Sequence, residues 1–304
     1  MDFWTQFDRV FPRTYTYRIL ENFWELFVEL YPYLAAGILI VVVLQQAVPR
    51  LHRLSFLHSH STAGIFAAAV AGTVAPLSVY LAVPMSVAFI LSGIPAPVII
   101  AFLFACPIAD PNLLLLTYGA LGWQMALARL VSALCLGFAA GLIYSKLGHR
   151  LPLTPPKTLA GLPDRHTGSL EQRNFWMSLW RQSFFIVKIF SVSLLLSAAI
   201  KALVPPDYVR MLFGKPGYFS ILLAIALGVP FYQCGGASIP IMQALSELGL
   251  SQGAILAFFI SGPATKIPAL YAFQEGYGTR FLFVFLIYTL AGAFAAGVIF
   301  NLIG

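Results

Sequence analysis

The sequence contains little charge. Asp, Glu, Lys and Arg make up 10% of its 304 residues, whereas 60% of the residues are hydrophobic. Soluble globular domains carry about 25% charged residues, so this composition excludes an ordinary soluble domain. The uncharged residues form apolar runs long enough to cross a bilayer, which takes about 20 residues in a helix. We therefore expect an all-α polytopic membrane protein that is embedded in the lipid bilayer.

Cysteines and the motifs of catalysis are also scarce. The three cysteines, Cys106, Cys135 and Cys234, all lie within apolar runs, which excludes a disulfide framework. The sequence contains no nucleotide-binding loop, no His-Glu-x-x-His and no Gly-x-Ser-x-Gly. We therefore expect no enzyme activity, no cofactor and no metal site. The first residues lack the apolar core and cleavage site of a signal peptide, so we expect none to be removed.

Acidic residues are fewer than basic ones, with 11 Asp and Glu against 18 Lys and Arg and a net charge of +7. The basic residues lie mostly between the apolar runs. Basic loops orient membrane proteins by staying in the cytoplasm, so this pattern favours a role in topology over nucleic-acid binding. It predicts a multi-pass protein of the cell inner (plasma) membrane with both termini in the cytoplasm.

The chain divides into four parts. These are an amphipathic segment at residues 1–25, a first membrane region at 26–145, a basic cytoplasmic linker at 146–182 and a second membrane region at 183–304. A shift of 156 residues superposes Pro84 on Pro240, Gly93 on Gly249, Pro107 on Pro263 and Gly122 on Gly278. This predicts two repeats of four helices, about eight transmembrane helices in all. Four helices in each repeat make the repeats parallel, whereas a re-entrant hairpin in each would invert them.

Small residues recur at equal positions late in each repeat. Phe138–Gly141 and Phe294–Gly297 both read Phe-Ala-Ala-Gly. Glycine and alanine let helix backbones approach closely in a membrane, so these runs predict close helix contacts. Arg129 and Arg280 lie near the ends of predicted spans, where we expect them to anchor helices at the interface.

Prolines and glycines interrupt several apolar runs, most densely over residues 226–268. Broken backbone within hydrocarbon is tolerated only where it is buried in protein or lines a cavity. Discontinuous helices near the midplane form the binding sites of many secondary transporters. We expect helix breaks at Pro76, Pro84, Pro107, Pro111, Pro230, Pro240, Pro263 and Pro268. The candidate substrate-binding residues are Ser78, Tyr80, Tyr232, Gln233, Cys234, Gly235 and Thr265.

Two charged residues occupy equivalent positions of the repeats. Asp110 and Lys266 are 156 residues apart, each at a proline-flanked break of the third helix of its repeat. Ionised groups at bilayer depth are costly unless paired or hydrated, and they usually mark partners or pathways. We expect the two breaks to face each other, so that these charges form a gating or static ion pair or a polar site for cargo.

The densest break carries a resemblance to a known family. The arsenical-permease-like family of predicted permeases typically has Pro-x-Cys-Ser-Cys-Gly at the break of the second helix in a half. Pro230, Cys234 and Gly235 match this motif, with Tyr232 at the first cysteine position and Gln233 at the serine position. The resemblance covers nearly the whole chain.

This resemblance implies a permease for a small-molecule substrate. The cargo it suggests is an organic metalloid, or a small sulfur-containing or anionic compound. A soft metalloid is generally held by two or three thiolates. Of the two cysteines in the family motif, this chain has only Cys234. The family usually has Asn before the second proline of the third helix, where this chain has Asp110. Cys106 lies at a break and is a candidate partner for Cys234.

Three functions fit these observations. The first is a secondary permease whose halves rock about the central breaks, driven by a proton or by the cargo gradient. The second is a membrane protein that transports nothing and carries out thiol or redox chemistry at Cys234. The third is a channel. Saturable, directional flux would distinguish the first from the others.

Overall fold

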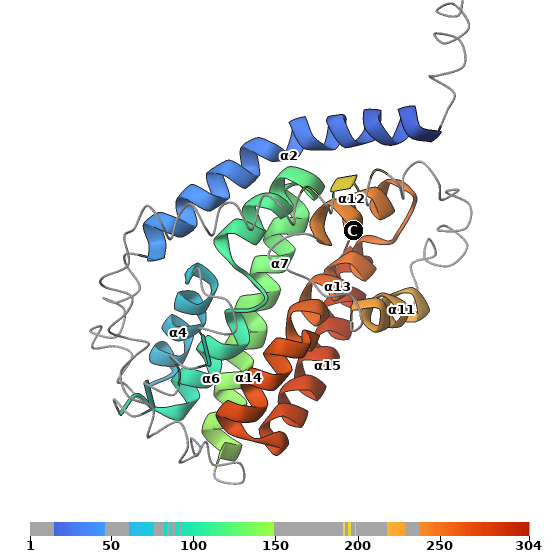
Figure 1. The fold of residues 1–304 in the computed structure, drawn as a ribbon. Helices are drawn as coiled ribbons and strands as arrows, with labels where there is room; N and C mark the ends of the chain where they lie inside the picture. The colour runs from blue at the N-terminus through green and yellow to red at the C-terminus, as the bar shows by residue number, and fades with distance from the viewer. Residues whose placement is uncertain are drawn as a thin grey trace, which may run out of the picture.

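The computed structural model describes residues 15–45, 61–75, 93–148, 218–228 and 238–303, with short helical pieces at 82–83, 86, 89–90, 191, 194–195 and 198. Within these ranges every regular element is a helix, as the sequence predicts. The helices are α2 (Tyr15–Gln45), α4 (Thr62–Val74), α6 (Ala96–Ala105), α7 (Pro111–Leu147), α11 (Tyr218–Gly228), α12 (Ser238–Glu247), α13 (Gln252–Thr265), α14 (Ile267–Tyr277) and α15 (Thr279–Ile303). Figure 1 shows α7 and α13 to α15 running along the bundle, with α2 lying across one end.

The long helix α7 consists of two helices joined at a sharp turn. Its 37 residues would extend about 55 Å if straight, nearly twice the roughly 30 Å of hydrocarbon in a bilayer. Gly122 divides them with φ 83° and ψ 174°, a conformation that is essentially confined to glycine. The part after the turn, residues 123–147, is long enough to span by itself. The sequence predicts this division, since its third span ends near Ala120 and its fourth begins near Met125.

Two described helices, α7 and α15, are long and apolar enough to cross a membrane. A third candidate is formed by α13 together with Ala269–Glu275 of α14, which are bent by 54° relative to each other. The apolar helices α4 and α6 are shorter. The described residues therefore supply two clear spans, or three with the bent pair. The first predicted span begins within the 31-residue helix α2, and the remaining ones fall on shorter helices or on residues outside the described ranges.

Close backbone approach holds the long helices against their neighbours. A Cβ atom at Gly141 of α7 would lie 2.8 Å from the carbonyl oxygen of Pro97 of α6. A Cβ atom at Gly297 of α15 would lie 2.6 Å from the carbonyl oxygen of Gly253 of α13. Neither site has room for a side chain. The prediction that both Phe-Ala-Ala-Gly runs make close helix contacts is therefore confirmed.

The buried apolar side chains form two clusters, and each draws on helices far apart in the sequence. The first joins α2 and α7 to α11, α12, α13 and α15. The second joins α4 and α6 to α14 and α15, with the Phe104 ring 4.8 Å from that of Phe285 and 5.1 Å from that of Tyr288. The first membrane region thus packs on the second through both clusters.

Helix α2 covers the start of α7 and part of α12. Its side chains Leu26 and Leu30 are buried in the first cluster, whereas Trp24 is exposed. The Gln243 side chain of α12 donates a hydrogen bond of 3.0 Å to the Glu29 carboxylate of α2. One continuous helix therefore includes the end of the predicted amphipathic segment and the start of the first predicted span.

Candidate functional site

Two breaks, between α6 and α7 and between α13 and α14, lie where the sequence predicts the broken third helix of each repeat. After α6 ends at Ala105, the chain passes through a turn that contains Pro107 and ends at Asp110, where α7 begins. After α13 ends at Thr265, Lys266 alone separates it from α14. Pro111 and Pro268 lie in the first turns of the helices that follow. A proline there removes no helical hydrogen bond, which favours a helix start at each point.

Pro263 does not interrupt a helix in this structure, because it lies inside α13, which continues to Thr265. Pro240 lies in the first turn of α12, and the residues just before that helix lie outside the described ranges. In a first turn the missing N–H would have been unpaired anyway. Pro76, Pro84 and Pro230 lie outside the described residues.

Asp110 organises the first break. It is the N-cap of α7, and its carboxylate accepts a hydrogen bond of 2.9 Å from the backbone N–H of Asn112. In an uninterrupted helix that N–H would bond to the carbonyl of Ile108. The cap therefore leaves the Ile108 carbonyl oxygen available to another donor. Asp110 also interacts electrostatically with Arg129 and Lys266.

Arg129 supplies that donor. Its Nε–H donates to the Ile108 carbonyl oxygen at 2.8 Å, and Nη1 donates to the Thr117 hydroxyl oxygen at 3.0 Å. The guanidinium carbon lies 4.6 Å from the centre of the Phe259 ring of α13, within the range of a cation–π contact. One side chain of α7 thus contacts both the first break and α13.

The prediction that Arg129 anchors a helix at the interface is wrong. The side chain is only 2% exposed and is the largest fully buried side chain of the described residues. It lies inside because the break in the third span exposes a carbonyl that a long donor of α7 can reach. Arg280, its companion in that prediction, is exposed.

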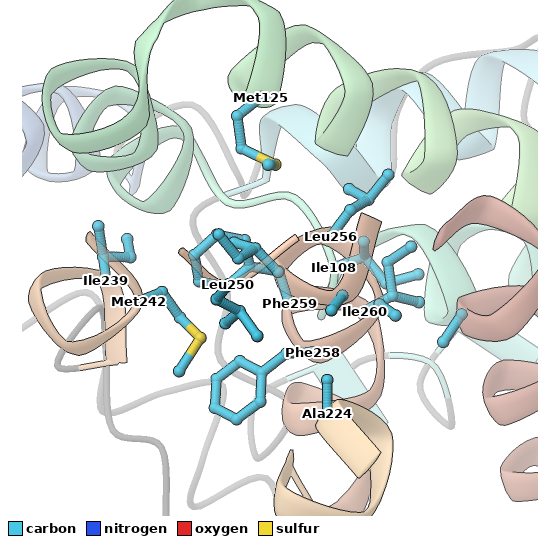
Figure 2. Close-up of a cluster of buried hydrophobic side chains, with 14 of the residues drawn as sticks. Ile108, Met125, Ala224, Ile239, Met242, Leu250, Leu256, Phe258, Phe259 and Ile260 are labelled. Atoms are coloured by element: carbon cyan, nitrogen blue, oxygen red, sulfur yellow. The ribbon is translucent and has the colours of Figure 1, made fainter. Parts of the chain in front are cut away.

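The surroundings of this charged group are apolar. Ile108 belongs to the first hydrophobic cluster, together with Met125 of α7 and Phe259 of α13. Figure 2 shows members of this hydrophobic cluster from α7, α11, α12 and α13. Electrostatic interactions are stronger in such a region than in water. Arg129 and the first break therefore form a polar centre within a packed core. Lys266, at the second break, attracts the Asp110 carboxylate, and we call Asp110, Arg129 and Lys266 together the central charge cluster.

Thr265 is the one predicted substrate-binding residue within the described ranges. It is 4% exposed, and its hydroxyl lies 3.1 Å from the carbonyl oxygen of Ser261 and 3.3 Å from that of Gly228. The second contact ties the end of α13 to the end of α11. The other six, Ser78, Tyr80, Tyr232, Gln233, Cys234 and Gly235, lie outside the described residues.

Sequence reasoning also missed two buried polar side chains. Asn112 and Gln243 are each 5% exposed, and among the described residues the side-chain oxygen of each has no hydrogen-bond partner. A buried acceptor without a donor is uncommon in native structures and calls for an explanation. Asn112 directly follows Pro111 at the first break, and that position was the only signal available in the sequence.

Comparison with known proteins places the chain in a family. A family model described as a predicted permease matches residues 15–302. The UPF0718 protein YcgR of Bacillus subtilis is 22% identical over 281 residues, which cover 91% of this chain and 95% of that protein. The UPF0718 protein MJ0584 of Methanocaldococcus jannaschii is 28% identical over 127 residues, 39% of this chain and 35% of that protein.

A third relative, the UPF0718 protein YraQ of Escherichia coli, is 22% identical over 185 residues, 61% of this chain and 52% of that protein. The chain therefore matches about a third of the archaeal relative and half of the E. coli one. No solved structure matches it. The family match and the apolar helices identify a multi-pass membrane protein. Because the model covers nearly all of its length, the chain belongs to this family of predicted permeases, the one that its sequence resembles.

Proposed function

We propose that this protein is a secondary permease that moves a small solute past the two helix breaks. The observation that carries the proposal is the central charge cluster. Ionisable side chains within a membrane are rare and usually face a pathway or a partner, and here three of them occupy two broken helices. Broken helices near the midplane are the usual construction of a transporter site.

The attraction between the Lys266 ammonium and the Asp110 carboxylate supports a gate made by the two halves. Each residue occupies the N-cap position of the helix that follows its break. A rocking motion of one half against the other would separate these charges on one side of the site. Thr265, which contacts the end of α11, would move with the second break.

We also propose that the two halves are repeats of four helices each. In support, α4 and α11 begin at residues 62 and 218, α6 and α13 at 96 and 252, and the second part of α7 and α15 at 123 and 279, each pair 156 residues apart. Gly122 and Gly278 share φ 83°. The chemistry of the halves differs, because the position equivalent to Arg129 is Phe285. We place the protein in the inner (plasma) membrane with both termini in the cytoplasm.

Flux into proteoliposomes tests this function. The native chain is compared with Asp110→Asn, Lys266→Gln and the charge-swapped double variant Asp110→Lys/Lys266→Asp, using small anions, thiol compounds and trivalent organoarsenicals as solutes. We expect saturable flux of at least one solute by the native chain and at least tenfold slower flux in each single variant. If the charge-swapped double variant regains flux, the two residues form a gating pair. If it remains inactive, at least one of the two charges contacts the cargo directly.

Three results would count against the proposal. Flux that rises linearly with solute concentration favours a channel, and the absence of flux in the native chain favours the protein without transport. Equal flux in all variants would show that the path avoids the central charge cluster. Arg280→Gln, a change on the exposed surface of α15, serves as the matched control for a lost charge.

A further inference from the structure

The hydrogen bonds of Arg129 leave much of its binding capacity unused. A guanidinium group has five N–H donors, and the bonds that it makes within the described residues use Nε–H and one Nη1–H. Both acceptors, the Ile108 carbonyl and the Thr117 hydroxyl, are neutral. The Thr117 hydroxyl donates its own proton to the Leu113 carbonyl oxygen at 2.6 Å, so it meets Arg129 purely as an acceptor. These bonds position the guanidinium without neutralising it.

The nearby carboxylate compensates this charge only in part. The Asp110 carboxylate is attracted by Lys266 as well as by Arg129. It also accepts a hydrogen bond from the Asn112 N–H. The other acidic side chains whose surroundings are described, Glu21, Glu25, Glu29, Glu247 and Glu275, are exposed or on the outer helix α2. A buried guanidinium beside one shared carboxylate is a favourable position for an added anion, because burial strengthens the attraction.

The edge of the guanidinium carries the N–H groups that the bonds to Ile108 and Thr117 do not use. The Phe259 ring packs over one face, and the bonds of Nε and Nη1 fix the orientation of the plane. The fork of a guanidinium matches a carboxylate or another oxyanion, which accepts two parallel N–H bonds. Two residues after Asp110, the buried Asn112 side-chain oxygen has no hydrogen-bond donor among the described residues. A hydroxyl or ammonium group on the same small molecule would supply that donor.

Building on the proposed permease function, we propose that Arg129 binds the negatively charged group of the cargo, which is a small carboxylate or other oxyanion. The oxyanion lies against the free Nη edge of Arg129, and Phe259 holds the guanidinium in place. Asp110 repels the anion and so limits the affinity, which a transported solute needs in order to leave the site.

The test measures binding separately from transport. The thermal unfolding midpoint of purified protein in nanodiscs is titrated with acetate, lactate, inorganic phosphate or sulfate at constant ionic strength set with sodium chloride. Acetamide is the neutral match for acetate. We expect a saturable rise in the midpoint with at least one anion and none with acetamide. Arg129→Lys, which keeps a charge but loses the fork, should weaken binding roughly tenfold, the effect of a single charge-assisted hydrogen bond. Arg280→Lys should bind like the native chain.

Asp110→Asn gives a prediction of opposite sign. Removing the repelling carboxylate should tighten anion binding by roughly threefold or more, even though the same change slows flux. A role of Asp110 and Arg129 in folding alone would move both variants in the same direction. If Arg129→Lys does not fold, the anion site is tested by the tighter anion binding of Asp110→Asn and by the contrast between acetate and acetamide.

The outcomes separate the two proposals. No saturable effect of any anion, equal binding by Arg129→Lys, or weaker binding by Asp110→Asn would overturn the anion site. Anion binding without flux in proteoliposomes would support the anion site and overturn the permease. Saturable flux of neutral solutes alone would support the permease and overturn the anion site.

Discussion

Replacing Arg129 with methionine removes every polar contact of a buried cation while keeping much of its length. Its two hydrogen bonds, at 2.8 and 3.0 Å, are worth about 1.5–3 kcal/mol each because the donor is charged. The cation–π contact with Phe259 adds about 0.5–2 kcal/mol. A buried methionine regains roughly 1.5–3 kcal/mol through its apolar surface. The net loss in the free energy of unfolding should therefore be about 0.5–6.5 kcal/mol, with a central value of about 3.5 kcal/mol.

The cause of that loss is open to a direct check. The Ile108 carbonyl is left without its donor, and Asp110 is left with Lys266 as its remaining partner in the central charge cluster. In Asp110→Asn/Arg129→Met no carboxylate is left without its arginine, because asparagine carries no charge. The start of α7 is kept, since asparagine is also an effective N-cap. The double variant should therefore be more stable than the sum of the single changes predicts, by about 0.5–3 kcal/mol.

Equilibrium unfolding in mixed micelles, followed by far-ultraviolet circular dichroism, measures both quantities. Ile287→Met on α15, where the side chain is 68% exposed, is the control and should change stability by less than about 0.5 kcal/mol. Arg129→Met with native or higher stability would refute the reasoning. That result would mean that the cost of burying the guanidinium exceeds the value of its contacts.

Two further predictions concern backbone positions. Gly122→Ala and Gly278→Ala should each cost about 1–3 kcal/mol of stability, although an added Cβ atom would meet nothing within 4 Å at either site; equal stability in the same unfolding assay would show that the turns relax. Asn301→Ala should cost about 1 kcal/mol, because the Asn301 side-chain oxygen accepts a hydrogen bond of 2.7 Å from the Gly253 N–H near the start of α13. Exchange of the Gly253 amide hydrogen should then be about fivefold faster, and an unchanged rate would contradict the capping role.

Local chemistry made part of this structure predictable. The helix start at Pro111 and the turn at Gly122 follow from residues whose backbone preferences act within one or two positions. The close contacts at Gly141 and Gly297 follow in the same way, since small residues in a membrane helix are used mainly for packing. Each of these features depends on neighbours in the sequence or on one helix face.

The position of Arg129 was not predictable in this way. Counting along the sequence places it about two turns after Gly122, near a membrane surface. Its actual partners are the Ile108 carbonyl, which the break leaves unbonded, and Phe259, which is 130 residues away. Both depend on how the halves pack together. Pro263 shows the opposite error, since a proline that resembles a break lies inside a continuous helix.

The central claim is that the helix breaks meet along a solute path, and side-dependent thiol labelling tests it most directly. In a chain whose three cysteines are replaced, Asn112→Cys is treated with a small, charged, membrane-impermeant thiol reagent. The control positions are Ala133→Cys, in the packed interior of α7, and Ile287→Cys, on the exposed apolar face of α15.

If the first break lines a path that opens to water, Asn112→Cys should react at least tenfold faster than both controls. A bound anion that reaches Arg129 should slow the reaction. Labelling of Asn112→Cys no faster than that of Ala133→Cys, from either side of the membrane, would contradict the account, because it would show that the break is closed core and not part of a path.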